Sequence, residues 1–479
     1  MLLDNVDDAC VILIESCSDK VVTAGDIRKQ AKRIDQSERG LVFLIADGTI
    51  ESACWFLALL EAHHPVALID PGNAWPVVSG LIDRYRPDLI IDPGSTKLMD
   101  LMSSPQGSLG QLIETAVWRA NECGPEPHDD LAVLLTTSGS TGSPKFVRLS
   151  SANIRANAEQ IVNSLGITAD DRAVTALPLF YSFGMSVLTS HALAGSSVLV
   201  TAVSVLEDQF WSDLVRHHVS FLPGVPATYS MLKRLGFDQR ELPSLRALTQ
   251  AGGRLAPELV TYFHQVMASR GGHFFVMYGQ TEASPRISCL PSEHLPEKLG
   301  SAGLALAGSK LSIRGQQGEK LAAREIGEVI YQGPNVMMGY AESREHLALG
   351  ATHGTVLSTG DLGYLDDDGF LYLTGRSKRI CKLAGTRISL DEIETVATGI
   401  LHGEAQIAAV DNGDAGVAIF ATSLENSAIT GLRRDIAKQL RVPPKLICVT
   451  RVEAIPMLPS GKTDYSALKQ SLSADGEPK

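Results

Sequence analysis

The stretch that decides the fold is Thr136-Thr137-Ser138-Gly139-Ser140-Thr141-Gly142-Ser143-Pro144-Lys145, in which glycine and hydroxyl residues lead to a lysine. An apolar run over 131–135 precedes it, and an amphipathic run follows from Asn153. Glycines let the backbone approach an anion, hydroxyls and N–H groups donate, and the lysine adds positive charge. The pattern therefore predicts a strand followed by a polyphosphate-binding loop. For the tract taken alone, an ordinary surface turn is an equally good interpretation.

Composition excludes several classes of function. The chain has 479 residues, enough for two to four structural units, with 44% hydrophobic and 20% charged residues. Its net charge of −12 argues against nucleic-acid binding. Seven scattered cysteines without Cys-x-x-Cys spacing indicate reduced thiols in a cytoplasmic protein and argue against a zinc site. The longest apolar run, 53–60, is far short of the ~20 residues of a membrane span, and the N-terminus lacks the basic start of a signal peptide.

Short apolar runs alternate with helical patterns through the first part of the chain. The runs at 41–46 and 65–69 flank a helical pattern at 51–62. Strand–helix–strand order of this kind predicts a mainly parallel sheet with covering helices. The helical pattern after the loop is expected to end at Gly166. The glycine-punctuated segment 94–124 gives no clear secondary-structure signal.

Six further motifs follow the loop in a fixed order. They are Leu177-Pro178-Leu179-Phe180-Tyr181-Ser182-Phe183-Gly184, Ala251-Gly252-Gly253, Tyr278-Gly279-Gln280-Thr281-Glu282, Ser358-Thr359-Gly360-Asp361 with Gly375-Arg376, Ile380 to Ile388, and Leu458-Pro459-Ser460-Gly461-Lys462. Together with the loop they resemble the motifs of the adenylate-forming superfamily, which comprises acyl-CoA synthetases, peptide-synthetase adenylation domains and firefly-type luciferases. The resemblance extends over nearly all of the chain.

The resemblance implies an α/β fold in two domains. Residues 1–376 would form a large N-terminal core of mainly parallel sheets with covering helices and a β-rich subdomain, which binds ATP and the acid. Residues 377–379 would be a hinge with Lys378 at its pivot. Residues 380–479 would form a small, mobile α+β domain that carries the catalytic lysine. The charged residue after the pivot, Arg379, is interpreted as a solvated surface residue.

The ATP-binding residues follow from the same motifs. An aromatic ring, a hydroxyl and a carboxylate in one turn suit a base, a phosphate and a hard cation, so Tyr278 would stack on adenine, Thr281 would bind the α-phosphate and Glu282 would hold Mg²⁺. A carboxylate can accept both ribose hydroxyls, which assigns Asp361 to the ribose and Arg376 to the ribose or a phosphate. The remaining expected ATP contacts are Thr137, Ser138, Gly139, Ser140, Thr141, Gly142, Lys145, Gly252, Gly253 and Gly279.

Two further residues are assigned to the two chemical steps. Lys462 would bridge the substrate carboxylate and the α-phosphate, and with Thr281 and Glu282 it forms the expected catalytic set. Gly385 would line the tunnel for the thiol, because a pantetheine arm passing close to backbone tolerates no side chain there. The alternative for Lys462 is a surface lysine in a polar turn. Tyr465 stands where the family usually has an arginine, which indicates a structural role.

The expected substrate pocket contains Tyr181, Phe183, Gly184 and Gly252. Many family members have histidine where this chain has Tyr181. Adenylation domains for α-amino acids have aspartate where it has Gly184, so the sequence predicts an acid without an α-amino group: fatty, short acyl or aryl. Phe146 replaces a glycine after the loop lysine and is expected to narrow the loop or to pack beneath it.

These assignments predict an AMP-forming acid–thiol ligase. It would use ATP and Mg²⁺ to convert a small carboxylic acid to an acyl-adenylate, and would transfer the acyl group to coenzyme A or to the phosphopantetheine of a carrier protein. Two alternatives remain: an acyl-AMP-forming enzyme with a non-thiol acceptor, and a non-catalytic nucleotide-binding member of the superfamily.

Overall fold

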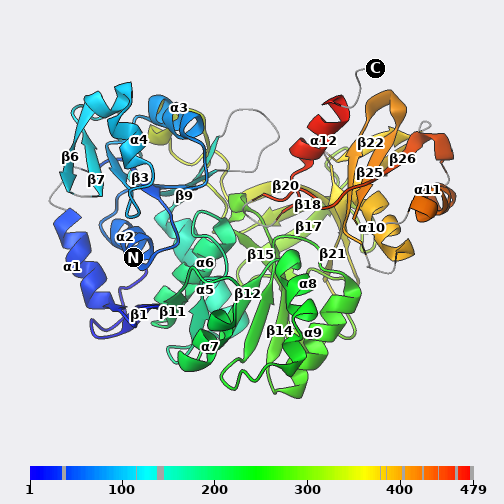
Figure 1. Cartoon of the computed structure of the whole chain (residues 1–479), viewed down its shortest axis with the longest axis horizontal. Coiled ribbons are helices and arrows are strands. Elements are labelled where there is room, and N and C mark those ends of the chain that lie inside the picture. Colours follow the sequence, from blue (N-terminus) through cyan, green and yellow to red (C-terminus); the bar gives the residue numbers. More distant parts are fainter. Residues whose placement is uncertain are drawn as a thin grey trace. The chain divides into compact units, whose positions relative to one another are not determined.

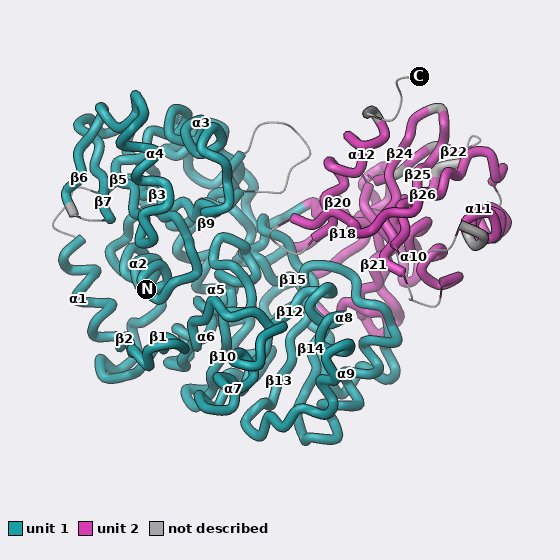
Figure 2. The backbone as a smooth tube through the Cα atoms, in the orientation of Figure 1, with its two compact units in different colours: residues 1–299, 305–310, 332–357 teal, residues 300–304, 311–331, 358–479 magenta. Residues whose placement is uncertain are grey.

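The chain forms two compact units. The computed structural model describes residues 1–34, 39–114, 116–136, 145–377, 379–383, 386–401, 405–422, 426–440, 442–458 and 462–474. Unit 1 comprises residues 1–299, 305–310 and 332–357; unit 2 comprises residues 300–304, 311–331 and 358–479. Figure 1 labels the helices and strands, and Figure 2 distinguishes the units by colour.

The first sheet of unit 1 is mainly parallel. Its strands follow the order β15-β14-β13-β12-β10-β11-β1-β2, and neighbours from β14 to β1 are parallel, whereas β15 and β2 are antiparallel to their neighbours. The bounds are β1 (Val11–Glu15), β2 (Val21–Thr23), β10 (Arg172–Val174), β11 (Ser197–Val200), β12 (Phe221–Gly224), β13 (Ala247–Gln250), β14 (His273–Gly279) and β15 (Arg286–Leu290). The short β16 (Leu304–Ala305) lies where the chain passes from unit 2 to unit 1.

The second sheet of unit 1 has the order β19-β9-β8-β4-β3-β5-β7-β6, with a parallel centre from β8 to β5. Its strands are β3 (Val42–Ile45), β4 (Val66–Ile69), β5 (Leu89–Ile91), β6 (Gly110–Glu114), β7 (Val117–Ala120), β8 (Leu131–Thr136), β9 (Phe146–Ser150) and β19 (Gly339–Ala341). Successive residues of β3 enter opposite cores: Val42 and Leu44 one cluster, Phe43 and Ile45 another. A strand buried on both faces needs such a continuous apolar run.

Helices fill the space around these sheets. They are α1 (Ala24–Ile34), α2 (Ile50–Glu61), α3 (Trp75–Tyr85), α4 (Leu98–Met102), α5 (Ser151–Leu165), α6 (Ser182–Leu193), α7 (Asp208–Arg216), α8 (Pro226–Arg234) and α9 (Pro257–Ser269), with short 3₁₀ turns η1 (Pro105–Leu109), η2 (Phe237–Gln239), η3 (Thr281–Ala283), η4 (Ser292–His294) and η5 (Glu345–Ala348). Helix α5 begins with a capping box of Ser150 and Asn153 and ends at the left-handed Gly166, the predicted end.

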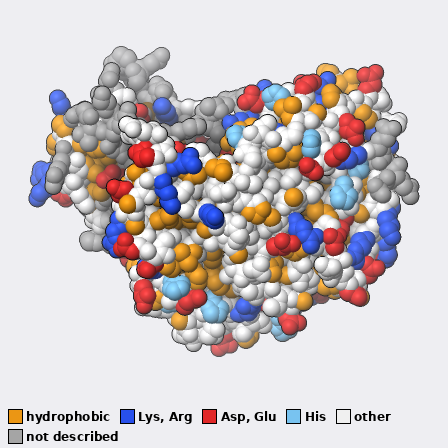
Figure 3. Space-filling view, turned by 180° about the vertical axis from the view of Figure 1, so that it is seen from behind, with side chains coloured by type: hydrophobic (Ala, Val, Ile, Leu, Met, Phe, Trp, Pro, Cys, Tyr) orange, Lys and Arg blue, Asp and Glu red, His pale blue; other side chains and the backbone are white. Residues whose placement is uncertain are grey.

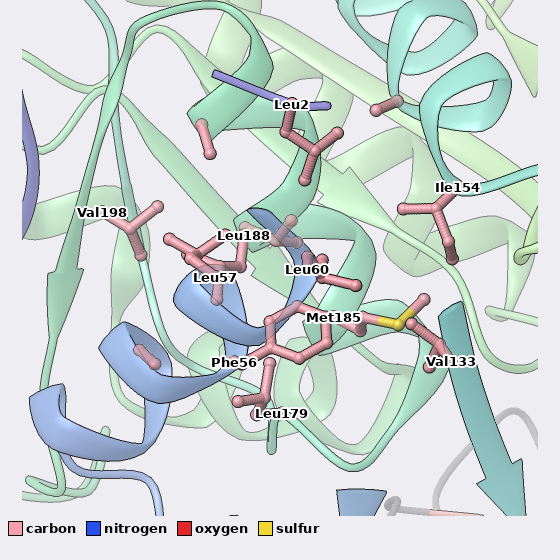
Figure 4. Close-up of a cluster of buried hydrophobic side chains, with 14 of the residues drawn as sticks. Leu2, Phe56, Leu57, Leu60, Val133, Ile154, Leu179, Met185, Leu188 and Val198 are labelled. Atoms are coloured by element: carbon pink, nitrogen blue, oxygen red, sulfur yellow. The ribbon is translucent and has the colours of Figure 1, made fainter. Parts of the chain in front are cut away.

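The main core of unit 1 joins residues of both sheets through α2, α5 and α6. Figure 4 shows Phe56 and Leu60 of α2 packed with Met185 of α6 and Val133 of β8. Helix α6 is buried on every side from Ser182 to Ala192. Its polar residues are therefore surrounded by protein, which matters for the pocket that this helix lines.

In its described residues, unit 2 contains small sheets and three α-helices. Its sheets are β17-β18-β20-β21, the hairpin β22-β23, and β24-β25-β26, in which β26 is parallel to β25. The elements are β17 (Lys310–Arg314), β18 (Gly327–Gln332), β20 (Val356–Leu365), β21 (Leu371–Arg376), β22 (Ile380–Leu383), β23 (Thr386–Ser389), β24 (Ile407–Asp411), β25 (Val417–Ala421), β26 (Ile447–Arg451), α10 (Leu390–Ile400), α11 (Asn426–Leu440), α12 (Tyr465–Ala474), η6 (Gly413–Ala415) and η7 (Pro444–Leu446).

The predicted α/β class with mainly parallel sheets in the N-terminal part is confirmed. One local expectation was incomplete: the loop after β8 leads into an antiparallel strand, β9, before α5 begins. The segment 94–124, which gave no clear signal, contains α4, η1, β6 and β7. The sheet with β20 and β21 belongs to unit 2, whereas the sequence placed 358–376 in the N-terminal core; the proposed hinge at 377–379 remains a prediction.

Charge is distributed without strong separation on the face shown in Figure 3, where Lys and Arg side chains alternate with Asp and Glu. Within the described part of the chain, every helix is too short or too polar to cross a membrane.

Candidate active site

The phosphate-loop candidates lie between two paired strands. Strand β8 ends at Thr136, and β9 begins at Phe146, directly after Lys145. Phe146, which stands where many relatives have glycine, is buried and packs edge-on against Tyr85 with ring centroids 4.7 Å apart. Its side chain therefore holds the start of β9, directly after Lys145, in the core. Six of the predicted contacts fall outside the described residues: Thr137, Ser138, Gly139, Ser140, Thr141 and Gly142.

Lys145 meets a residue that the sequence analysis did not assign. Its Nζ lies 3.6 Å from the centroid of the Tyr340 ring, a cation–π contact. Strand β19 carries Tyr340 and pairs with β9, with Tyr340 opposite Val147. The sheet thus fixes the position of the tyrosine beside the lysine.

The same tyrosine contacts the predicted metal-binding carboxylate. Its hydroxyl donates to Oε1 of Glu282 over 2.7 Å. Burial, and then the neighbouring Glu282 carboxylate, raise the pKa of Tyr340, so its hydroxyl stays protonated and donates. Lys145, Tyr340 and Glu282 therefore form one continuous contact chain within unit 1, although they come from three distant parts of the sequence.

The turn that carries Glu282 is fixed by a close backbone approach and by hydrogen bonds from residues 335 and 337. Gly279 is required, because a Cβ there would lie 2.0 Å from the carbonyl oxygen of Pro285. The Asn335 side chain donates to the Arg286 carbonyl over 2.8 Å, and Met337 N–H donates to the Glu282 carbonyl over 2.9 Å. These hydrogen bonds fix the backbone on both sides of Glu282.

Tyr278 and Thr281 occupy the two ends of this turn. Tyr278 is half-buried near the end of β14, and Thr281 begins η3. Thr281 Oγ1 donates to Oγ of Ser182 over 3.3 Å, which joins the turn to the first residue of α6. The turn and the predicted substrate pocket are therefore neighbours.

The pocket residues lie at the start of α6 and beside β13. Tyr181 is the N-terminal flanking residue of α6, and Phe183 is buried in the first turn of the helix. A Cβ on Gly252, whose φ is +86°, would lie 2.6 Å from the Tyr181 hydroxyl oxygen, so these two residues face one another. Gly253 is exposed, and a Cβ there would lie 3.2 Å from Pro226.

Gly184 has a strict steric requirement. A Cβ at this position would lie 2.1 Å from the carbonyl oxygen of Pro178, closer than any real side chain is found. An aspartate, which α-amino-acid adenylation domains have here, would therefore not fit this backbone. The glycine is a structural necessity in this chain as well as a difference from those domains.

Asp361 and Arg376 are brought together within unit 2. They are direct partners across β20 and β21, and Nε of Arg376 lies 3.0 Å from Oδ1 of Asp361. The carboxylate is nearly buried, with 8% of its side chain exposed, whereas 60% of the Arg376 side chain is exposed. An arginine that is mostly in solvent can turn toward an incoming ligand at small cost.

The region after Arg376 differs from the prediction at one residue. Arg379, expected on a solvated surface, is largely buried: it pairs with Asp391 and Glu394 and lies 3.8 Å from the centroid of the Tyr465 ring. The Tyr465 hydroxyl donates to Oε2 of Glu394 over 3.2 Å, which gives Tyr465 the structural role expected from its replacement of arginine. Lys378 and Gly385 lie outside the described residues.

Lys462 takes part in backbone pairing. Leu458 N–H donates to the Lys462 carbonyl over 2.7 Å, and Met457 and Thr463 form a β-bridge. The lysine side chain is half-buried. The pairing fixes the backbone at the predicted catalytic residue and at Thr463 after it.

The donors suit a magnesium ion that a nucleotide brings with it. Among the described residues, no cluster of three or more His, Cys, Asp or Glu side chains could hold a metal by itself. Mg²⁺ is commonly bound by one or two carboxylates together with substrate phosphates and water, and Glu282 supplies one half-buried carboxylate. The residues present therefore fit a metal shared with ATP.

The fold and these sites define an adenylate-forming enzyme architecture. The family model of AMP-binding enzymes matches residues 30–341, more than half of the chain, so the chain belongs to this family. The 2-succinylbenzoate–CoA ligase of Bacillus subtilis is 35% identical over 269 residues, 56% of this chain and 53% of that protein. An oxalate–CoA ligase of Arabidopsis thaliana is 30% identical over 312 residues, 64% of this chain and 58% of that protein. The matched part is thus a little over half the length of these relatives.

Solved structures agree over nearly the whole chain. The o-succinylbenzoate CoA synthetase of Bacillus subtilis, in complex with its acyl-adenylate intermediate, superposes with a TM-score of 0.76 at 24% identity and covers 98% of this chain and 96% of its own. ATP-bound MatB of Rhodopseudomonas palustris gives a TM-score of 0.81 at 20% identity, with coverages of 99% and 98%. At these identities the likeness concerns the fold.

Proposed function

We propose that the protein is an AMP-forming acid–thiol ligase. A carboxylate oxygen of the acid attacks the α-phosphorus of ATP, the bond from that phosphorus to the bridging oxygen breaks, and pyrophosphate leaves. A thiol sulfur then attacks the acyl carbonyl carbon, AMP leaves, and the thiol proton passes to solvent. Membership of the AMP-binding family and CoA ligases among the relatives support this reaction class.

The observation that carries the proposal is the contact chain of Lys145, Tyr340 and Glu282, with Thr281 in the same turn. It offers a cation, a hydroxyl and a carboxylate within one site, the groups needed to bind a polyphosphate with its metal. The barrier to adenylation is largely electrostatic, because an anion must approach a polyanion. Lys145 would lower that repulsion at the phosphates, and the Thr281 hydroxyl would turn from Ser182 to donate to the α-phosphate.

Magnesium would be held at Glu282 and would neutralise charge on the phosphates. The role of Tyr340 is then to orient the Glu282 carboxylate through its hydrogen bond. In unit 2, Asp361 would accept from the ribose hydroxyls once Arg376 turns aside, and Lys462 would bridge the acid and the α-phosphate.

A rotation about the segment 377–379 would separate the two half-reactions. In this proposal residues 1–376 hold the acyl-adenylate while residues 380–479 replace Lys462 with Gly385, which admits the thiol. Contacts of the described residues across this segment would have to adjust. They include the hydrogen bond from the Arg376 N–H to Oδ2 of Asp391 over 3.0 Å and the one from the Arg379 N–H to the Arg376 carbonyl over 3.0 Å.

The acid is proposed to lack an α-amino group. The lack of room for any side chain at Gly184 supports this, since the usual partner of an ammonium group cannot stand there. Coenzyme A is the first candidate acceptor because the relatives are named as CoA ligases. A carrier-protein phosphopantetheine is the second, since it presents the same thiol arm, and a cytoplasmic location suits both.

ATP–pyrophosphate exchange with a panel of acids tests the proposal. Wild type should show acid-dependent exchange, and Lys462→Ala should lose it while still binding ATP. Product analysis with coenzyme A and with a phosphopantetheinylated carrier then separates the acceptors. Nucleotide binding without exchange for any acid would favour the non-catalytic alternative, and exchange without transfer to either thiol would favour a non-thiol acceptor.

A further inference from the structure

Arg286, the first residue of β15, is a buried arginine that the reaction scheme does not use. Only 3% of the residue is exposed. Its backbone is fixed: the N–H donates to Oδ1 of Asn157 over 3.1 Å, and its carbonyl accepts from the Asn157 and Asn335 side chains. The guanidinium carbon lies 4.0 Å from the centroid of the Phe183 ring. A rigid backbone and a stacked side chain hold this charge in one place.

The charge of Arg286 lacks a carboxylate partner in the described part of the chain. Burial lowers its pKa to about 10, and the groups that oppose this are the neutral Tyr181 hydroxyl and the Cys289 thiol. The side chain is therefore cationic at neutral pH. Its Nε, which is buried, has no hydrogen-bond acceptor among the described residues. Buried charges are normally paired, because an unpaired ion in the interior costs several kcal/mol.

A small cavity lies beside this guanidinium. Side chains of α5, α6 and four strands line it, and those that matter here are Phe183, Ser186, Ser190, His191, Met277 and Arg286. It has room for one water-sized group. The polar hydrogens on α6 are already used: Ser190 Oγ and His191 Nδ1 both donate to the Val187 carbonyl, over 3.1 and 2.9 Å. Burial also lowers the pKa of His191 to about 4, so it is neutral. Arg286 therefore supplies the positive charge of this cavity.

The cavity shares a wall with the predicted substrate pocket. Phe183 lines the cavity and stacks on Arg286, and its ring also packs edge-on against Tyr181, with centroids 6.4 Å apart. Tyr181 in turn lies close against Gly252, another residue of the predicted substrate pocket. The guanidinium is thus one aromatic ring away from the residues expected to surround the acid.

We propose that Arg286 selects acids that carry a second anionic group, a carboxylate or sulfonate, at the end remote from the reacting carboxylate. This inference rests on the proposed ligase activity and adds its substrate class. The distal anion accepts hydrogen bonds from the guanidinium, including Nε, and completes the missing ion pair. The small cavity has room for about one oxygen atom of that anion beside the guanidinium, and it excludes a long alkyl chain.

The test compares acids that share a skeleton and differ only at the distal group. Two sets serve: pentanoate, ω-hydroxypentanoate and glutarate; and benzoate, meta-hydroxybenzoate and isophthalate. ATP–pyrophosphate exchange gives kcat/KM for each acid with wild type, Arg286→Met and Arg286→Lys. Arg270→Met is the matched control, because Arg270 also lies over a phenylalanine, 5.1 Å from the Phe237 centroid, and neither of these residues lines the cavity.

Wild type should prefer the dianionic acid of at least one set. Arg286→Met should lower kcat/KM for that acid by about 10- to 100-fold, the range for a hydrogen bond to a charged group, and change the monocarboxylate by less than about threefold. Arg286→Lys should recover part of the loss. The control should leave the ratio of the two acids unchanged, and thermal unfolding of each variant shows how much of any loss is structural.

Three results would overturn the inference. They are a wild-type preference for the apolar or hydroxy acid, an unchanged ratio in Arg286→Met, and an equal loss for all acids that Arg286→Lys does not repair. In each of these the exchange itself proceeds, so the ligase proposal stands. Absence of exchange with all six acids and with a wider panel would instead count against the ligase activity.

Discussion

Replacing Tyr340 with phenylalanine isolates one hydrogen bond of the candidate ATP site. The ring and its cation–π contact with Lys145 remain, and only the 2.7 Å bond to Glu282 is lost. Hydrogen bonds to charged groups contribute about 1.5–3 kcal/mol. Glu282 is half-buried, so water can replace part of the bond, and the lower limit of about 1.5 kcal/mol applies. That corresponds to roughly a tenfold loss of kcat/KM.

Tyr340→Ala also removes the ring beneath Lys145. A cation–π contact contributes about 0.5–2 kcal/mol, so the loss should increase to roughly 100-fold. ATP–pyrophosphate exchange at saturating acid, with ATP varied, measures both variants. A double-mutant cycle with Glu282→Gln should give a coupling of about 1 kcal/mol or more between the two side chains.

The chain offers a matched control for this prediction. The Tyr262 hydroxyl donates to Oδ1 of Asp238 over 2.7 Å at an exposed place on α9, so Tyr262→Phe removes the same kind of bond away from the site. It should leave kcat/KM unchanged. If Tyr340→Phe behaves like this control, or if its effect simply adds to that of Glu282→Gln, Tyr340 does not orient the carboxylate.

Four further perturbations have defined outcomes. Gly184→Ala should lower the melting temperature and abolish exchange, because its Cβ would collide with the Pro178 carbonyl at 2.1 Å; a fully folded and active variant would contradict this. Asp361→Asn should raise KM for ATP about tenfold with thermal stability nearly unchanged, whereas an unaltered KM would remove it from the ribose site. Arg379→Met should lower the free energy of unfolding by about 3 kcal/mol, because it leaves Glu394 buried without its partner; chemical denaturation measures this, and a loss below about 1 kcal/mol would show that the pair is dispensable. Burial alone would raise the pKa of Asp171, but hydrogen bonds from Arg246, Thr168 and Ser220 hold that pKa at about 2. The ionised carboxylate therefore stabilises the folded state by about 2 kcal/mol above pH 3.8, and this stabilisation is lost as the pH falls toward 2. Asp171→Asn should flatten that part of the plot of stability against pH, and an unchanged plot would refute the assignment.

The strands and helices of the core could be predicted because their signals are local. The buried runs around β3, β4 and β5 are continuous in sequence, and the glycine at 166 marks the end of α5 directly. Strand β9 was not predicted from the sequence, because it is short and lies directly between a polar loop that ends in a lysine and the residue that caps α5. The strand β6 escaped because it lies at a sheet edge, where Leu112 remains 47% exposed and no clear alternation develops.

The candidate site could be assigned only where short segments carry it. The turn from Tyr278 to Glu282 and the pair of Asp361 and Arg376 were assigned from their motifs; the structure pairs Asp361 with Arg376, and the roles of these residues stay predictions. Tyr340 was not found, because its role depends on the pairing of β19 with β9 and on a contact with a residue 58 positions away. The burial of Arg286 and Arg379 was missed for the same reason: a charged residue in sequence is most often exposed, and only tertiary packing buries it.

The pairing of β9 with β19 also determines which segments have to be exchanged together when parts of this site are moved between related proteins. Exchanging the loop after β8 between relatives would move Lys145 and Phe146. It would leave behind Tyr340, which contacts Lys145, and the edge strand β19, which carries Tyr340 and pairs with β9. A chimera that keeps this arrangement therefore has to carry two separate insertions, the hairpin of β8 and β9 and the segment around β19.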